Sequence, residues 1–131
     1  MARPRITNAC PCGLGQPYDE CCGPAHRGQP PASAEALMRS RYAAFALDDT
    51  AYVLSSWHPD TRPASVESDP DLRWVGLNLL VTSGGGMFDT EGIVEFVAHF
   101  RDGGQAGELR EVSRFVRHAG RWVYWGPLIS G

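Results

Sequence analysis

The sequence predicts an α+β fold in which helices come first and an antiparallel sheet follows. Two observations support this class. Apolar residues recur at helical spacing between residues 33 and 57, and from Trp74 onward they alternate as they do in strands. The strand-like segments are separated by short turns that contain glycine, and no internal repeat is present. We therefore expect helices packed on a meander of sequential strands.

The first helix is predicted over residues 34–49. Ser33 is a favourable N-cap residue, because its side-chain oxygen can accept a hydrogen bond from a free backbone N–H of the first turn. Met38, Tyr42 and Phe45 fall on one face of this helix and are predicted to face the core.

A second short helix is predicted over residues 49–57, before Pro59, and a loop is predicted over 59–71. Four strands follow, with turns at 83–86 and 102–107 and a tight hairpin at Ala119-Gly120. The predicted strands cover residues 73–83, 92–101, 108–118 and 121–126.

Alternation predicts which strand residues are buried. In the first strand one face is expected to carry Val75, Leu77, Leu79 and Val81. In the second strand one face is expected to carry Val94, Phe96, Ala98 and Phe100. The opposite face of the second strand then carries Ile93, Glu95, Val97 and His99.

Composition limits the possible classes of function. The chain has 131 residues, of which 43% are hydrophobic and 21% charged, with a net charge of −3. This charge provides no global attraction to nucleic acid. No apolar run approaches the roughly 20 residues of a membrane helix, and no secretory signal precedes the domain. We therefore expect a cytoplasmic protein, as a monomer or homodimer.

All four cysteines lie within one short segment, at positions 10, 12, 21 and 22. In the cytoplasm thiols stay reduced, which disfavours disulfides. The spacing is closer than that of usual iron–sulfur sites, and a redox pair is usually Cys-x-x-Cys. We therefore predict structural zinc, with Cys22 or His26 as the fourth ligand. Gly13 and Gly15 permit the positive φ angles of a loop wrapped around the sulfurs.

The residues Cys10-Pro11-Cys12-Gly13, Gly15, Tyr18 and Cys21-Cys22-Gly23 resemble the SEC-C motif, the zinc knuckle of the protein-export ATPase SecA. This resemblance implies that the zinc ligands are Cys10, Cys12, Cys21 and Cys22. The segments "AEALMRSRYAAF", "WHPDTRP", "VEFVAHFRDGG" and "EVSRFVRHAGRWVYW" are together similar to the YchJ family of small bacterial proteins.

The YchJ resemblance implies a knuckle followed by a nuclear-transport-factor-two-like domain, in which helices and a curved sheet form a cone with a cavity. We accordingly divide the chain into a basic tail and zinc knuckle over residues 1–24, a linker over 25–32 and the α+β domain over 33–131. The resemblance does not imply a particular reaction.

Several polar residues are candidates for this implied cavity. The first group is His58, Asp60 and Arg62, in which the histidine could act as an acid or base oriented by the aspartate. The alternative is local structure: a histidine at a helix C-terminus, and Arg62 paired with Asp60. Glu95 and His99 share one strand face, and they either enter the pocket or face water.

Arginines are candidate ligands for an anion, namely Arg39, Arg41 and Arg114. Structural pairing is the alternative for these arginines. Glu95 is expected to be partly buried beside an arginine such as Arg114. Trp74, Trp122 and Trp125 are expected in the core.

Two function classes follow from these residues. The first is a protein-interaction or ligand-binding module with a structural zinc knuckle. The second is a small-molecule enzyme of isomerase, dehydratase or hydrolase type that uses a polar cavity; no strong catalytic motif supports it. The SecA knuckle docks on an acidic chaperone through lysines, whereas this chain has Asp19 and Glu20 in that interval. Nearby arginines, namely Arg3, Arg5 and Arg27, offset only part of this charge, so docking of that kind is disfavoured.

Overall fold

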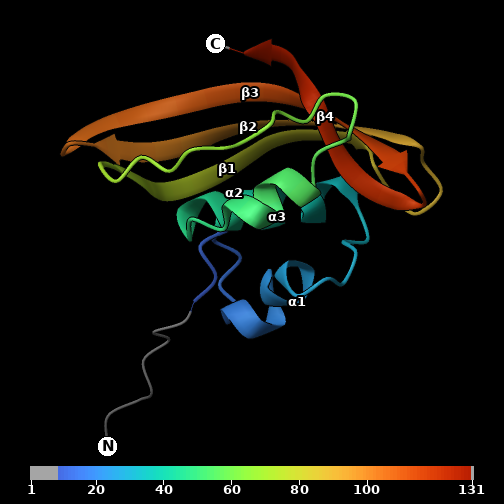
Figure 1. Cartoon of the computed structure of the whole chain (residues 1–131), viewed down its shortest axis with the longest axis horizontal. Coiled ribbons are helices and arrows are strands. Elements are labelled where there is room, and N and C mark those ends of the chain that lie inside the picture. The colour runs from blue at the N-terminus through green and yellow to red at the C-terminus, as the bar shows by residue number, and fades with distance from the viewer. Residues whose placement is uncertain (1–8, 131) are drawn as a thin grey trace, which may run out of the picture.

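A computed structural model describes residues 9–130, which fold into three layers (Figure 1). The sheet is one layer, two helices lie against one of its faces, and the cysteine-rich segment lies beyond the helices. This arrangement confirms the predicted α+β class. Most of the predicted basic tail, with Arg3 and Arg5, lies outside the described residues.

The sheet is an antiparallel meander with strand order β1-β2-β3-β4. Its strands are β1 (Leu72–Gly84), β2 (Glu91–Asp102), β3 (Gln105–His118) and β4 (Arg121–Ser130). The hairpin turn at Ala119-Gly120 is present, with φ angles of 52° and 79°. The turn between β2 and β3 is shorter than predicted, because Gly103 and Gly104 both have positive φ and reverse the chain in two residues.

The burial predicted for the first strand is partly wrong. Val75 and Val81 are 58% and 52% exposed, although they were expected to share a buried face with Leu77 and Leu79. The pairing of β1 with β2 shifts register between Trp74 and Gly76 and again between Leu79 and Val81. Each shift inserts one extra residue and reverses the alternation beyond it.

The buried face of β2 is as predicted for most of its length. Val94, Phe96 and Ala98 are nearly inaccessible, at 1%, 5% and 2% exposure. This face carries the helices. The β2 residues that alternate with these three, including Glu95, project from the opposite face of the sheet.

Helix α2 (Ala34–Ala46) begins as predicted, because the Ser33 side chain accepts a hydrogen bond from the N–H of Ala36 at 3.1 Å. It ends three residues earlier than expected. Asp49 does not extend α2; its carboxylate accepts a hydrogen bond from the N–H of Tyr52 and caps α3 (Thr50–Ser55). Asp49, at the predicted end of the first helix, is therefore the cap of the next one.

The N-terminus of α2 lies directly against the turn between β1 and β2. The N–H of Ala34 donates to the carbonyl of Gly85 at 3.0 Å. A Cβ atom built on Gly85 or Gly92 would lie only 2.6 or 2.8 Å from the Cβ of Ala34. Glycine is therefore required at both positions for this close approach of helix and sheet.

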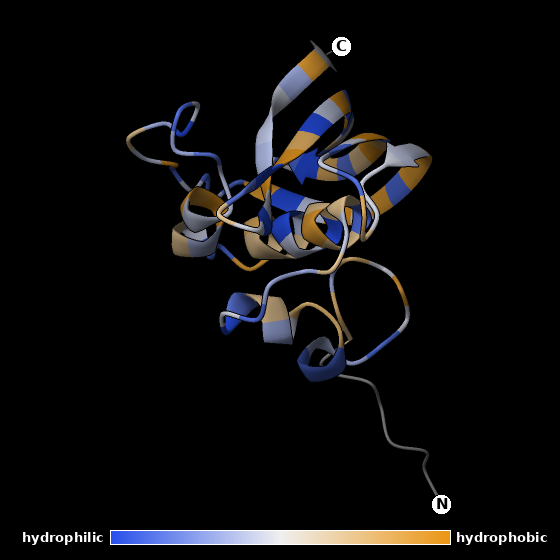
Figure 2. Cartoon of the chain, turned by 90° about the vertical axis from the view of Figure 1, so that its right-hand side faces the viewer, coloured by the Kyte–Doolittle hydropathy of each residue, from blue (hydrophilic) through white to orange (hydrophobic). Residues whose placement is uncertain are grey.

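The cysteine-rich segment contains a 3-10 helix, η1 (Tyr18–Glu20), and one turn of helix, α1 (Gly23–His26). The α1 turn spans the predicted boundary between knuckle and linker at residue 24, and Pro24 is favourable in it because no N–H is needed there. Figure 2 shows this segment as a small unit below the helices. Among residues 9–130, none of the helices has the length and apolar composition of a membrane span.

Candidate metal centre and cavity

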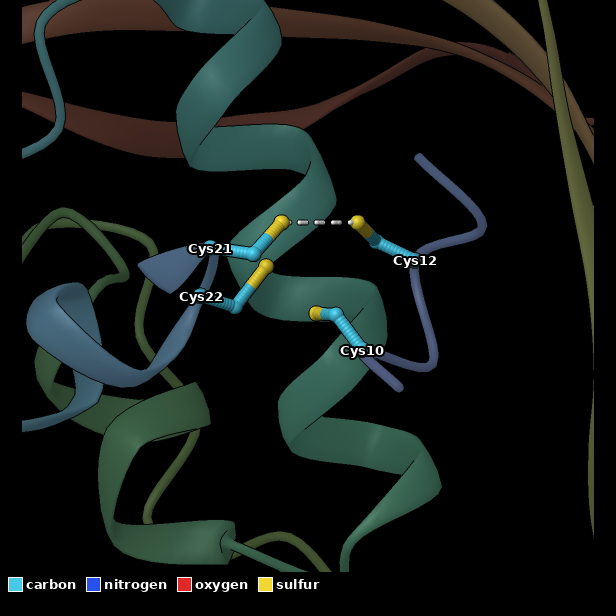
Figure 3. Close-up of side chains that lie close together, drawn as sticks. All are labelled: Cys10, Cys12, Cys21 and Cys22. Carbon is cyan, nitrogen blue, oxygen red and sulfur yellow. Dashed lines mark hydrogen bonds between the residues drawn. The ribbon is translucent and has the colours of Figure 1, made fainter. Parts of the chain in front are cut away.

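Four cysteine sulfurs meet beneath α2. The Sγ atoms of Cys10, Cys12, Cys21 and Cys22 all lie within 4.8 Å of one another. Cys10 and Cys12 precede the segment 13–20, and Cys21 and Cys22 follow it. All four side chains point toward a common centre (Figure 3). A tetrahedral zinc site with Zn–S bonds of about 2.3 Å has sulfurs about 3.8 Å apart. The four residues therefore fit a metal ion with four sulfur ligands.

Hydrogen bonding and burial favour the thiolate at Cys12 and the protonated thiol at Cys21 and Cys22. Hydrogen bonding from Cys22, helped by the N–H of Leu14, lowers the pKa of Cys12 to about 5. Burial raises the pKa of Cys21 to about 12, and the hydrogen bond to Cys12 raises that of Cys22. A divalent cation would reverse this preference, because a coordinated thiol is deprotonated. The donor set is thus suited to a cation that offsets the charge of several thiolates.

His26 lies outside the four-sulfur cluster and has a different role. Its Nε2 donates to the carbonyl of Ser40 on α2 at 2.8 Å, so Nδ1 of the neutral ring accepts from the hydroxyl of Tyr18. The ring also packs on Tyr52, with centroids 4.5 Å apart. Both ring nitrogens are therefore used in holding the knuckle against the helices.

Arg39 makes a second connection between the knuckle and α2. Its Nη1 donates to the carbonyl of Cys12 at 3.1 Å, and its Nε lies 3.4 Å from Glu35. Cys12 is completely buried, and Cys10 and Cys22 are also part of the core that includes Leu37. The cysteine segment therefore shares its core with the α+β domain.

A cavity of about 240 Å³ lies between α2 and the sheet. Its walls are mostly apolar and aromatic. They include Met38, Tyr42, Trp57, Trp74, Phe96 and Leu109. Cavities of this kind, apolar with a few polar groups, are typical of small-molecule sites, although this one is smaller than a drug-sized pocket.

Arg41 lines this cavity and is only 4% exposed. Its Nη1 donates to the carbonyl of Val53 at 2.9 Å and to the hydroxyl of Ser56 at 2.7 Å. Its guanidinium lies over the rings of Tyr124 and Trp57, at 4.3 and 4.9 Å from their centroids. Burial lowers the pKa of Arg41 to about 10, which leaves it charged at neutral pH.

Glu111 is the acidic residue of the cavity wall. Its Oε2 accepts hydrogen bonds from the hydroxyls of Ser113, at 2.5 Å, and Tyr124, at 2.7 Å. Burial, followed by the contact with Glu111, raises the pKa of Tyr124, so its phenol stays protonated and donates. The cavity therefore combines one cation, one carboxylate and a phenol among aromatic walls.

The residues proposed around His58 lie away from this cavity. The His58 ring contacts the rings of His118 and Trp125, at 4.7 and 4.8 Å between centroids. Its Nδ1 accepts from the backbone N–H of Asp60, whose carboxylate is 3.9 Å away. Arg62 donates to the carbonyl of Trp57 and does not pair with Asp60. The contacts are local, as in the alternative, but the Arg62–Asp60 pair that the alternative named is absent.

Glu95, His99 and Arg114 lie on the sheet face opposite the helices. Glu95 is paired with Arg110 at 2.7 Å, so its neighbouring arginine is Arg110 and not the expected Arg114. His99 bonds to Asn78 at 2.7 Å, and Arg114 pairs with Glu91. Among the candidate residues, Arg41 lines the cavity between α2 and the sheet, whereas six do not: His58, Asp60, Arg62, Glu95, His99 and Arg114.

The three tryptophans expected in the core occupy different positions. Trp122 is 2% exposed and belongs to the core. Trp74 is partly buried and lines the cavity, where it packs edge-on against Tyr42. Trp125 is partly buried and contacts His58 and Arg114.

Glu111 was missed by the sequence analysis, although the pattern contained a signal for it. Leu109, Glu111, Ser113 and Phe115 have the same parity on β3, and Phe115 is fully buried. Alternation therefore places Glu111 on the same strand face as the apolar residues Leu109 and Phe115. Arg41 lies one helical turn before the cavity residue Phe45 and was considered only as one of three arginines.

The fold and the cysteine cluster together define a class, an NTF2-like α+β domain with an N-terminal SEC-C metal motif. A family model described as the middle NTF2-like domain of YchJ matches residues 33–127, and a SEC-C motif model matches residues 7–24. The chain belongs to the YchJ family, whose curated members carry the name UPF0225.

Relatives cover nearly the whole chain. A UPF0225 protein of Streptomyces coelicolor is 50% identical over 119 residues, which are 90% of this chain and 93% of the relative. A UPF0225 protein of Bordetella parapertussis is 47% identical over 126 residues, 92% of each chain.

Two solved structures share the fold. The solution structure of a SEC-C motif containing protein from Rhodopseudomonas palustris has a TM-score of 0.78 and 39% identity, over 90% of this chain and 95% of that chain. A SEC-C motif containing protein from Psychrobacter arcticus has a TM-score of 0.73 over 96% of this chain and 85% of that chain, and at 24% identity it supports the fold alone.

Proposed function

We propose that this protein is a small-molecule-binding module in which a structural zinc knuckle supports the helix that forms the binding cavity. One observation carries the proposal. Three consecutive residues of α2 serve both sites: Arg39 and Ser40 hold the knuckle through Cys12 and His26, and Arg41 lines the cavity.

Zinc is the cation proposed for the cysteine cluster, and Cys10, Cys12, Cys21 and Cys22 are its proposed ligands. Four cysteines complete a tetrahedral site and leave no position for water or substrate, which is typical of structural zinc. Three of the four are buried. The zinc would supply a fixed crosslink that orders the knuckle, and it takes no part in binding the ligand.

The proposal is tested with indole, a small neutral aromatic probe, and the purified full chain with its bound metal. Indole is expected to shift the amide signals of residues on the cavity wall, such as Ala98 and Ser113, and to leave those of the opposite sheet face unchanged. Absence of binding to the cavity, with the protein folded, would contradict the proposed function.

An enzyme is the second candidate, and Glu111 favours it. A carboxylate in an apolar cavity beside a phenol, here Tyr124, is suited to proton transfer. An enzyme would return a bound small molecule in a chemically altered form, and Glu111→Gln would bind the molecule without altering it. A binding module returns the molecule unaltered in both forms of the protein.

A further inference from the structure

We propose that the cavity selects a small aromatic monocarboxylate, whose anionic group pairs with Arg41 while its ring lies between the aromatic walls. This inference rests on the proposed binding function and names the chemical class of the ligand. It depends on three features of the cavity: an arginine that forms no ion pair, a carboxylate on the sheet side, and aromatic walls.

Some N–H donors of Arg41 have no acceptor among the described residues. A guanidinium has five N–H donors, and the protein acceptors for Arg41, Val53 and Ser56, both contact Nη1. Among residues 9–130, Nε and Nη2 have no hydrogen-bond acceptor, and no carboxylate forms an ion pair with this arginine. Neither atom is among the fully buried nitrogens that lack a partner, so both keep some accessible surface, and a ligand anion in the cavity would accept their hydrogen bonds.

The negative charge of Glu111 partly offsets the burial of Arg41 through space, but no ion pair joins the two side chains. The Oε2 atom of Glu111 is occupied by the hydroxyls of Ser113 and Tyr124. It lies on β3, in the sheet, whereas Arg41 lies on α2, on the helical side of the cavity. The negative charge of Glu111 also disfavours a dianion, so a single carboxylate at the α2 side is the favoured charge.

The remaining walls favour an aromatic ring. Apart from its few polar groups, the cavity is enclosed largely by aromatic side chains. They are Tyr42, Phe45, Trp57, Trp74, Phe96 and Tyr124. An aromatic ligand ring that packs edge to face against such side chains gains binding free energy beyond that of the apolar area it buries. A volume of about 240 Å³ limits the ligand to a small molecule with one or two rings.

Indole-3-acetate and indole-3-acetamide are matched probes, because they have the same shape and differ in charge. The full metal-loaded chain is titrated with each probe by calorimetry at neutral pH. We expect the acetate to bind roughly ten- to a hundredfold more tightly, which is the range for hydrogen bonds to a charged group.

Arg41→Met is expected to remove this preference and to keep binding of the acetamide, which also shows that the variant is folded. Arg41→Lys retains the positive charge and should keep part of the preference. Arg114→Met, on the opposite face of the sheet, is the matched control and should bind both probes as the wild type does.

Equal affinity of the wild-type protein for the two probes would overturn the inference, and so would a preference for the acetate that persists in Arg41→Met. The two proposals fail differently. If indole binds and the acetate is not preferred, the binding function stands and the choice of an anionic ligand is wrong. If indole and both derivatives fail to bind, the binding function itself is wrong.

Discussion

Arg41 and Glu111 illustrate how two opposite charges are accommodated in one apolar cavity. Arg41 is held by aromatic faces and by two oxygens of the α3 region, and Glu111 is held by two hydroxyl donors. A desolvated cation over aromatic rings gains about 2 kcal/mol. Tyr124 is common to both charges, because its ring lies against the guanidinium and its hydroxyl donates to Glu111.

Glutamate-to-glutamine substitutions on the two faces of the sheet should have different effects. Glu95 pairs with Arg110, whose side chain is 61% exposed, so Glu95→Gln should change the free energy of unfolding by less than about 0.5 kcal/mol. Glu111→Gln weakens two hydrogen bonds to a carboxylate and should cost about 1–2 kcal/mol. Urea denaturation measures both values. A larger loss at Glu95 than at Glu111 would contradict this assignment of the two faces.

The same two residues show what the sequence predicts about the site. Alternation along β2 predicts that Glu95 and Phe96 lie on opposite faces of the sheet, but it does not show which face carries the helices. Glu95 was chosen for its apolar neighbours Ile93 and Val97, which lie on the open face and are only partly buried. Neighbours on one strand therefore indicate a face, and only the packing of another layer decides whether that face lines a cavity.

The strands and helices were predicted more successfully where their pattern is local. The Ser33 cap and the Ala119-Gly120 turn depend on a few adjacent residues, and both are present. The two register shifts in β1 depend on how that strand pairs with β2, and nothing in the alternation of β1 reveals them. The α1 turn at Gly23–His26 is not predicted from the sequence, because its stability comes from contacts with α2.

The knuckle is the element whose stability should depend on metal. The purified chain should contain about one zinc, bound by four thiolates. Its two helical segments are too short to be stable alone, so a chelator should unfold the knuckle and leave the amide signals of β2 and β3 in place. Elemental analysis and amide spectra provide the two measurements.

Cys21→Ser is the control for this prediction, because it removes one ligand at the most exposed of the four positions. It should lower the zinc content and disorder the same residues as the chelator. Iron in place of zinc, or loss of the whole sheet on chelation, would show that the cluster or its separation from the sheet has been assigned wrongly.

Across the whole molecule, buried tyrosines should set the alkaline limit of stability. Burial raises the pKa of Tyr42, Tyr52 and Tyr124 above the usual value of about 10. The native state therefore favours the protonated phenols. The free energy of unfolding should be unaffected by these groups below about pH 10 and should fall as the pH rises above it.

Ultraviolet absorbance of tyrosinate, recorded beside denaturant midpoints across this pH range, tests the prediction. In the folded protein the absorbance should rise at higher pH than it does in urea. Absorbance that rises near pH 10 while the midpoints stay constant would show that these phenols are accessible to solvent in the native state.

The adjacency of Arg39, Ser40 and Arg41 on α2 has a thermodynamic consequence if both sites bind as proposed. Two ligands that stabilise the same helix are linked, and linkage is reciprocal: any factor by which zinc strengthens binding in the cavity is also the factor by which the cavity ligand strengthens zinc binding. Coupling energies between such sites are typically about 1–3 kcal/mol. Zinc depletion would then lower the occupancy of the cavity at unchanged ligand concentration, and abundant ligand would help the protein retain its metal.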